Sequence, residues 1–469
     1  MNDFVSQTAA LAANRGRQGN AARRAALACM AALAVALGVG RFAFTPLLPL
    51  MLHGGALDLR HGGWLASLNY AGYFVGAFSC AALRVAPARI VRASLVATVL
   101  LTIAMGVAHQ FWVWAIVRFV GGAVSAWAFV FASQWGLRRL AELGANEWSG
   151  VIYTGPGFGI IGTGLFVGVA GSLGAAAGWI GFGIVSAVIT ALVWAVFGEG
   201  AARSPAGASN ATNGPTSTSP RNDSAANTVD GTSNAAQREP AAVRREQAAG
   251  TRGVTSSGRA TSTAASPATA SKTAHAAAPR TPSRRADALW LVLLYGIPGF
   301  GYIITATFLP VIARHALPGS AWPDLFWPMF GVALVVGALL AARLPLHWDN
   351  RSLLAVCYVL QATGIALGIV WPTAPGFSLG SVLIGLPFTA ITLFAMREAR
   401  LMHGERAAGL MGYATAAYGI GQIAGPLVAA PLAASTGSFS PSLWLAAIAL
   451  VAGAAGLAWR VAVSPRAAA

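Results

Sequence analysis

Long apolar stretches, separated by short polar segments, run through most of this 469-residue chain. A run of about 20 apolar residues is long enough to cross the roughly 30 Å hydrocarbon layer of a bilayer as a helix. The pattern predicts twelve such spans. They fall near residues 25–52, 62–83, 90–108, 111–136, 148–171 and 174–198, and then near 287–313, 323–343, 351–371, 376–396, 407–432 and 440–463.

The composition agrees with this pattern, because 56% of the residues are hydrophobic and only 10% are charged. Soluble domains carry about 25% charged residues. The sequence therefore predicts an all-α integral membrane protein and excludes a soluble or secreted form. Arginines at 15, 17, 23 and 24 precede an apolar run that is too long for a signal peptide, so we expect the first span to be retained.

The net charge of +17 could indicate nucleic-acid binding, but its distribution argues against that partner. The loops expected on one side of the membrane hold most of the loop arginines, and the opposite loops hold only Arg60 and Arg314. This asymmetry follows the positive-inside rule. It predicts an inner-membrane protein with both termini in the cytoplasm. The arginines on the cytoplasmic side are Arg84, Arg89, Arg92, Arg138, Arg139, Arg343, Arg351, Arg397, Arg400 and Arg406.

A polar segment divides the chain, since residues 201–284 contain no Trp, Phe, Tyr, Leu or Ile. Such a segment cannot bury a core, and we expect a disordered basic linker over 200–286. The linker is either a passive tether or a segment that touches anionic lipid headgroups. The predicted parts are a cytoplasmic tail (1–24), a six-helix bundle (25–199), the linker, a second six-helix bundle (287–463) and a cytoplasmic tail (464–469).

The two sets of six spans carry a weak internal repeat, as transporters built from duplicated halves often do. A shift of 261 residues places "GVGRFAFTPLLP" (38–49) on "GFGYIITATFLP" (299–310), and the same shift places Gly76 on Gly337. A shift of 259 residues places Gly150 on Gly409 and Gly162 on Gly421. In this register Arg41 meets Tyr302. The matches together indicate a duplication.

Several motifs carry a family resemblance. "RFVGGAVSA", from Arg118, resembles the fourth-span Arg-x-x-x-Gly pattern of the major facilitator superfamily, and "GVIYTGPGFG" resembles its fifth-span Gly-Pro motif at Gly155 and Pro156. "GQIAGP", ending in Gly425 and Pro426, resembles that motif in the second half. "GVGRFAFTPLLPLM" is similar to the first span of the YbfB/YjiJ group of these carriers.

The resemblance implies two six-helix bundles, with the first, fourth, seventh and tenth spans lining a central cavity. It therefore places Arg41 and Arg118 at that cavity. Counted along their spans, the two arginines lie about 12 Å and about 10 Å from the outer ends. A buried charge costs about 2.5–3.5 kcal/mol, and a guanidinium matches the geometry of a carboxylate or phosphate. The alternative is that each arginine binds backbone carbonyls at a helix junction.

The remaining candidates are uncharged. Tyr302, Thr305 and Thr389 are expected to contact substrate, although helix-to-helix hydrogen bonding is an equal alternative. Thr307, Thr392, Asn69, Tyr70, Tyr73 and Gln422 are weaker candidates. The Gly-Pro motifs should let helices bend during a conformational switch. The loop "ARLPLHWDNR" supplies gating candidates Arg343, Asp349 and Arg351, whereas "CAALRVAPARIVR", its counterpart in the first half, has no acidic residue.

No Asp, Glu or His lies in the middle of a predicted span, so proton coupling would use boundary groups such as Asp58, Glu147 or Asp287, or the substrate itself. Gly157, Gly159 and Gly162 spell G-x-G-x-x-G, but no strand precedes them, and a dinucleotide site is not expected.

The sequence thus predicts a secondary carrier, monomeric and surrounded by lipid, that moves a small organic anion by alternating access. It predicts no catalytic set, no metal site and no cofactor. An efflux carrier for drugs or metabolites, and a transporter-like receptor or scaffold, remain alternatives.

Overall fold

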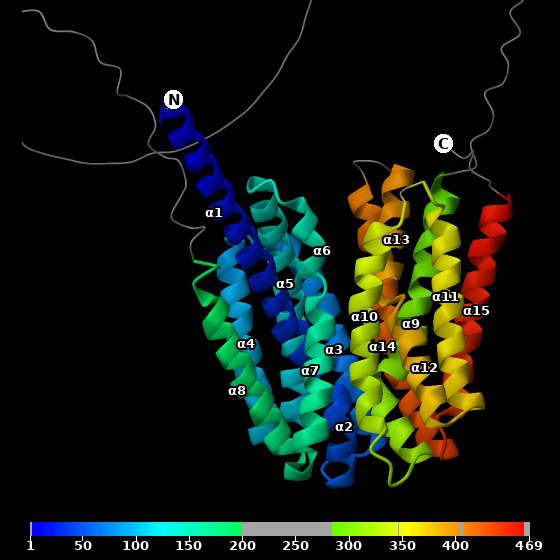
Figure 1. Ribbon diagram of the computed structural model, residues 1–469. Helices are drawn as coiled ribbons and strands as arrows, with labels where there is room; N and C mark the ends of the chain where they lie inside the picture. The colour runs from blue at the N-terminus through cyan, green and yellow to red at the C-terminus, as the bar shows by residue number, and fades with distance from the viewer. Residues whose placement is uncertain (1, 199–283, 346, 404–406, 464–469) are drawn as a thin grey trace, which may run out of the picture. The chain divides into compact units, whose positions relative to one another are not determined.

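The computed structural model describes residues 2–198, 284–345, 347–403 and 407–463, and these belong to one compact unit. Every regular element in these ranges is helical (Figure 1). The all-α prediction is therefore confirmed. Most of the predicted linker (200–286), the predicted C-terminal tail (464–469) and Arg406 lie outside the described residues.

The first half of the chain begins with α1 (Asn2–Leu33), which covers the predicted N-terminal tail and leads through the π-helix η1 (Ala34–Val39) into α2 (Phe44–His53). Two short helices, η2 (Cys80–Ala82) and η3 (Asn146–Trp148), follow α3 and α5, and η4 (Gly171–Leu173) separates α7 from α8. The other helices are α3 (Leu59–Ser79), α4 (Pro87–Val107), α5 (Phe111–Glu142), α6 (Ser149–Ile152), α7 (Gly155–Ala170) and α8 (Gly174–Trp194).

The second half has fewer breaks, and its first helix, α9 (Arg284–Ala316), is continuous where the first span is interrupted. The remaining helices are α10 (Pro323–Arg343), α11 (Asn350–Val370), α12 (Ala374–Gly385), α13 (Phe388–His403), α14 (Ala408–Thr436) and α15 (Ser440–Val463).

Local chemistry explains where several helices start. Asp58 and Asp349 precede α3 and α11, and their carboxylates accept hydrogen bonds from the backbone nitrogens of His61 and Arg351. Pro87 stands in the first turn of α4, where a missing N–H costs nothing.

The first span is broken at the stretch that carries Arg41. The nitrogens of Gly40 and Phe42 bond to carbonyls five residues earlier, at Val35 and Leu37. Thr45 then bonds to the carbonyl of Phe42, three residues back, and Pro46 has no N–H to donate. The backbone thus passes from a wide turn to a tight one, and this irregular backbone places Arg41 between η1 and α2.

Close helix contacts are made at glycines. A Cβ on Gly76 of α3 would overlap the backbone of Ala123 of α5, and a Cβ on Gly337 of α10 would overlap Leu386, between α12 and α13. Small residues allow such approach in membrane helices. Gly76 and Gly337 are partners in the sequence repeat, and they join corresponding helices. The matched glycines Gly38 and Gly299 likewise approach backbone, at Gly159 and Tyr418.

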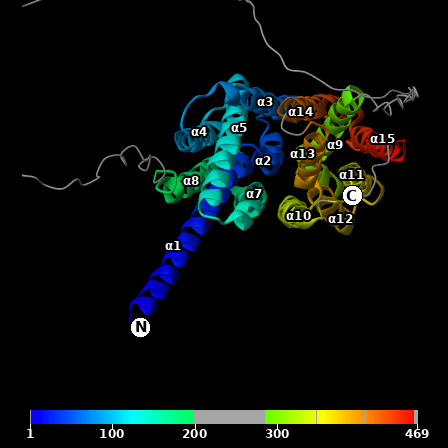
Figure 2. The same ribbon diagram turned by 90° about the horizontal axis from the view of Figure 1, so that it is seen from above.

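Helices far apart in sequence lie side by side. In the end-on view α3 packs beside α14 and α7 beside α10, and α2 also contacts α9 (Figure 2). These three pairs join the helices before the linker to those after it. Nearly all the residues that bear on the functional site lie on them or on α5 and α13.

Ten segments of the described chain are long and apolar enough to cross a membrane. They include helices at eleven of the twelve predicted positions. The stretch Asn146–Trp194, which contains both α7 and α8, counts as one segment, and α3 is not among the ten.

Candidate functional site

Arg41 lies at the break in the first span and is 4% exposed. Its Nη2 donates a hydrogen bond of 2.8 Å to Oε1 of Gln422 on α14. Its Cζ lies 4.0 Å from the ring centroid of Tyr73, 5.0 Å from that of Tyr70 and 5.4 Å from that of Phe42. Such cation–π contacts stabilise a guanidinium when water is excluded. Arg41 thus contacts the part of the chain on the far side of the linker.

Gln422 connects Arg41 to an aromatic surface formed by Tyr302, Tyr418, Tyr295 and Phe388. Its Nε2 donates to the hydroxyl of Tyr302 on α9, so the amide bridges the two residues that the sequence repeat pairs. The ring of Tyr302 stacks on Tyr418 at 6.0 Å, and Tyr418 stacks on Tyr295 at 4.9 Å. The rings of Phe388 and Tyr302 form a T-shaped pair with centroids 5.0 Å apart. Arg41 therefore borders an aromatic surface from α9, α13 and α14.

Arg118 lies on α5 and is 3% exposed. Its Nη1 and Nη2 donate to the carbonyl oxygens of Gly40 and Arg41, at 3.4 and 3.3 Å. Its Cζ is 4.7 Å from the ring centroid of Phe44. These carbonyls belong to the irregular backbone described above, so Arg118 stabilises the break that presents Arg41. This is the carbonyl-binding arrangement that the sequence left open as the alternative.

Three further hydrogen bonds run between helices before and after the linker. Thr45 Oγ1 donates to the carbonyl of Ala306 at 2.9 Å, and Ser67 Oγ donates to that of Ile423 at 2.8 Å. The hydroxyls of Tyr70 and Thr307 are 3.0 Å apart. Together with the bond from Arg41 to Gln422, they form a polar seam along α2, α3, α9 and α14.

Neither Arg41 nor Arg118 forms an ion pair with any carboxylate in the described ranges, although ion pairs occur elsewhere, as between Arg314 and Asp324. The Nε of each arginine is buried and has no hydrogen-bond partner among these residues. The polar seam is therefore positively charged. Glu398, a fully buried carboxyl on α13, does have an interaction partner. The sequence did not single it out, because it follows the apolar run.

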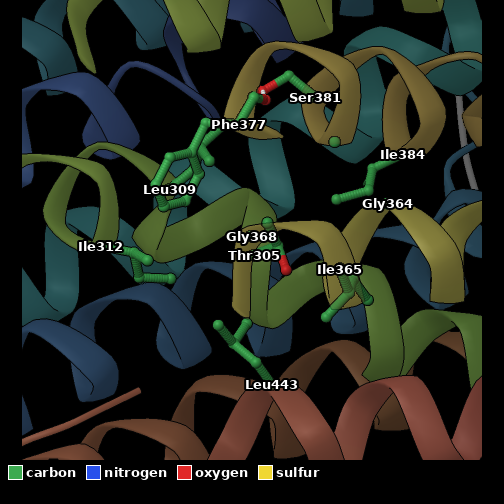
Figure 3. Close-up of a pocket in the computed structure, with 11 residues that line it drawn as sticks. Thr305, Leu309, Ile312, Gly364, Ile365, Gly368, Phe377, Ser381, Ile384 and Leu443 are labelled. Atoms are coloured by element: carbon green, nitrogen blue, oxygen red, sulfur yellow. Dashed lines mark hydrogen bonds between the residues drawn. The ribbon is translucent and has the colours of Figure 1, made fainter. Parts of the chain in front are cut away.

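The other predicted substrate contacts are placed differently. Thr305 lines a small cavity of about 10 Å³ between α9, α11, α12 and α15, which Figure 3 shows. That volume suits about one water molecule. Thr389 follows Phe388 on α13, and its buried hydroxyl has no partner among the described residues. Thr392 accepts a hydrogen bond of 3.0 Å from the hydroxyl of Tyr295.

The gating candidates also divide into two kinds. Gly155 begins α7 against the carbonyl of Met30, with Pro156 in its first turn, and Gly425 packs on Ile303 beside Pro426 in α14. Arg351 bonds to Asp349 and to the carbonyl of Arg460, at 2.7 and 3.2 Å. Asp287 pairs with Arg460, so these groups join α9, α11 and α15. Arg343, at the end of α10, is exposed.

The residues that sequence reasoning undervalued are Gln422 and the tyrosines that accompany it. A lone Gln in an apolar helix is a visible signal, yet its partner lies 381 positions away and only packing reveals the pair. Tyr418 and Tyr295 gave no signal, because only the packing of α9 against α14 brings their rings together.

The apolar helices are those of a polytopic membrane protein, and comparison with known proteins gives its class. The chain belongs to the family described as "Uncharacterised MFS-type transporter YbfB", which it matches over residues 33–224 and 259–457. The family resemblance noted in the sequence is thereby confirmed, and the chain is a multi-pass membrane transporter. No curated protein sequence matches it.

Solved structures share the fold. A mutant form of the nucleoside transporter NupG superposes with a TM-score of 0.62 at 12% identity, over 93% of this chain and 99% of that one. Another NupG structure superposes with a TM-score of 0.57 at 10% identity, over 94% of this chain and 98% of that one. At this identity the likeness shows the fold alone.

Proposed function

We propose that the protein is a secondary active carrier that moves a small organic anion across the inner membrane by alternating access. The observation that carries this proposal is Arg41, a buried guanidinium beside the polar seam that has no carboxylate partner among the described residues. Arg118 adds a second positive charge next to it.

The energetic argument favours an anion. A charge at the centre of a membrane helix costs about 2.5–3.5 kcal/mol even on the lenient insertion scale. A buried donor on a charged group that lacks a partner costs about 1–3 kcal/mol more. An anionic substrate would offset both costs during each transport cycle, while a cation would add to them. The same argument disfavours efflux of cationic drugs.

Alternating access is supported by the matched halves. We propose twelve spans in two bundles, 25–199 and 287–463, in which α3 is the second span and α7 and α8 are the fifth and sixth. The two bundles would meet along the polar seam, where α2 contacts α9 and α3 contacts α14, and also where α7 packs on α10. Rocking about this seam would expose Arg41 and Tyr302 to each side in turn.

We also propose an orientation in the membrane and a set of gating residues. Basic residues gather at the ends of α5, α10 and α13, which supports cytoplasmic termini. The Gly-Pro pairs at Gly155 and Gly425 would bend α7 and α14 during the switch. Arg343, Asp349 and Arg351 would lie on the cytoplasmic side, and the carrier would act as a monomer in lipid. Thr389, next to Phe388, would contact the substrate directly. Thr305 would contribute from the small cavity between α9, α11, α12 and α15.

The test is a thermal-stabilisation screen of the purified full chain with matched acids and amides. The pairs are acetate with acetamide, benzoate with benzamide and succinate with succinamide, and glucose 6-phosphate covers phosphates. Uridine is included because the solved structures of the same fold are nucleoside transporters. We expect at least one acid, and not its amide, to raise the melting temperature. Stabilisation by uridine alone would overturn the anion proposal.

Arg41→Ala is the site variant, and Arg60→Ala, which changes an exposed arginine in the first turn of α3, is the matched control. Loss of one partner of a buried charged pair costs about 2–5 kcal/mol, so the apparent affinity should fall at least about thirtyfold in Arg41→Ala and stay unchanged in Arg60→Ala. An unchanged affinity in Arg41→Ala would refute the site. A chain that acts as a receptor or scaffold would instead lose function on deletion of residues 205–280.

A further inference from the structure

Gln422 forms hydrogen bonds with both Arg41 and Tyr302, the two residues at the centre of the candidate site. Its oxygen accepts from Arg41 Nη2, and its nitrogen donates to the Tyr302 hydroxyl. The residue is 4% exposed and lies on α14, whereas Arg41 lies in the first span. The amide therefore closes the seam between the two halves at the position of the buried charge.

The Nε of Arg41, which has no hydrogen-bond partner among the described residues, indicates which ligand would replace the Gln422 amide. Nε and Nη2 form one edge of the guanidinium, and two parallel N–H groups on that edge match the two oxygens of a carboxylate. Gln422 satisfies Nη2 alone, while the buried Nε has no partner among the described residues. The rings of Tyr73, Tyr70 and Phe42 lie against the same guanidinium, and the Tyr73 side chain also hydrogen-bonds to Arg41, but Nε stays without a partner among these residues.

We propose that Gln422 is a built-in substitute for the substrate. In the empty carrier its amide oxygen occupies half of a carboxylate site on Arg41, and the carboxylate of the substrate displaces it by bonding to both Nε and Nη2. This inference rests on the proposed function and deepens it, because it names a carboxylate as the transported group. Displacement also breaks the bond from Arg41 to α14, so binding loosens the seam.

The contacts of Gln422 make a direct test available. A glutamate in its place has the same shape, and both neighbours can donate to it: Arg41 through Nη2, and Tyr302 through its hydroxyl. Gln422→Glu should supply an internal carboxylate, raise the melting temperature of the ligand-free protein by about 2 °C or more, and abolish stabilisation by acetate, benzoate and succinate.

Two variants control this experiment. Gln134→Glu places the same charge on an exposed position of α5. It should change neither the melting temperature of the ligand-free protein nor its stabilisation by the acids. In Arg41→Ala/Gln422→Glu the gain in melting temperature should disappear, because the new carboxylate has lost its partner. If Gln422→Glu is no more stable than Gln134→Glu, or keeps its gain without Arg41, the substitution role is wrong.

Gln422→Ala keeps the inference testable if the glutamate variant does not fold. It removes the competitor of the substrate, so the affinity for the acid that stabilises the native protein should rise about fivefold to tenfold. A loss of affinity would make Gln422 a substrate ligand and overturn the inference. If Gln422→Glu behaves as expected but none of the acids binds the native protein, the carboxylate site on Arg41 stands and the proposed anion transport fails.

Discussion

Arg118 donates a hydrogen bond of 3.3 Å to the carbonyl oxygen of Arg41, so the two intramembrane arginines are joined through the backbone of one of them. The second guanidinium nitrogen of Arg118 bonds to Gly40, which belongs to the same irregular turn. The guanidinium of Arg41 bonds instead to Gln422 on α14. The two arginines thus make different contacts, since Arg118 bonds to the backbone of the first span and Arg41 bonds to a side chain of α14.

Arg118→Ala should lower stability more than it lowers intrinsic affinity for an anion. Two bonds from a charged donor are lost, and each is worth up to about 1.5–3 kcal/mol, or less where membrane helices find other partners. We expect the melting temperature of the purified protein to fall by several degrees. A lysine has a single ammonium group in place of the planar fork, so Arg118→Lys should recover only part of the loss. Wild-type stability in Arg118→Ala would refute this role.

The close approach of α3 and α5 can be tested at Gly122. A methyl group there would overlap the backbone of Asn69 and Tyr73, whereas nothing lies within 4 Å of a methyl group at Gly162. Overpacking costs about 1–3 kcal/mol, and removing a helical glycine gains up to about 1 kcal/mol. Gly122→Ala should therefore reduce the folded yield and the melting temperature, and Gly162→Ala should preserve or raise both. Equal behaviour of the two would contradict the packing.

The polar seam predicts how accessible its interior is. Ala306 is 2% exposed, and its carbonyl accepts from Thr45. In a background without the native cysteines, Ala306→Cys should react slowly with a hydrophilic maleimide. Adding Thr45→Val and Tyr70→Phe removes two bonds across the seam, each worth about 1 kcal/mol, so labelling should accelerate severalfold. Ser435→Ala, which changes an exposed hydroxyl bonded within α14, is the control and should leave the rate unchanged.

Arg351 and Arg343 were predicted together but should respond differently to substitution. Arg351 is largely buried and bonds to Asp349 and to the end of α15. Breaking a buried pair by removing one partner costs about 3–5 kcal/mol. Arg351→Ala should therefore destabilise the protein strongly. Arg343 is exposed, and surface substitutions change stability by about 0.5 kcal/mol or less, so Arg343→Ala should alter transport without altering the melting temperature. Equal loss of stability would contradict this division.

The sequence by itself determined the helical membrane fold, the family and the positions of most spans. Those features depend on the local density of apolar residues and on short motifs such as the one around Arg118, and both are readable without packing. The sequence repeat also has a structural counterpart, because the matched glycines Gly76 and Gly337 make corresponding close contacts. Arg41 stood out because a single charge in an apolar run is costly wherever the run lies.

Only the tertiary structure decided what the polar residues contact. The bond from Arg41 to Gln422 joins residues 381 positions apart, and no local pattern reports such a pair. The same holds for Arg118, whose carbonyl partners are left available by a π-helical break that the sequence does not mark. Thr305 and Tyr302 are three residues apart on α9, yet the neighbouring helices decide that Thr305 lines a small cavity while Tyr302 bonds to Gln422. The sequence fixes which side chains are polar, but helix rotation and packing decide which of them meet.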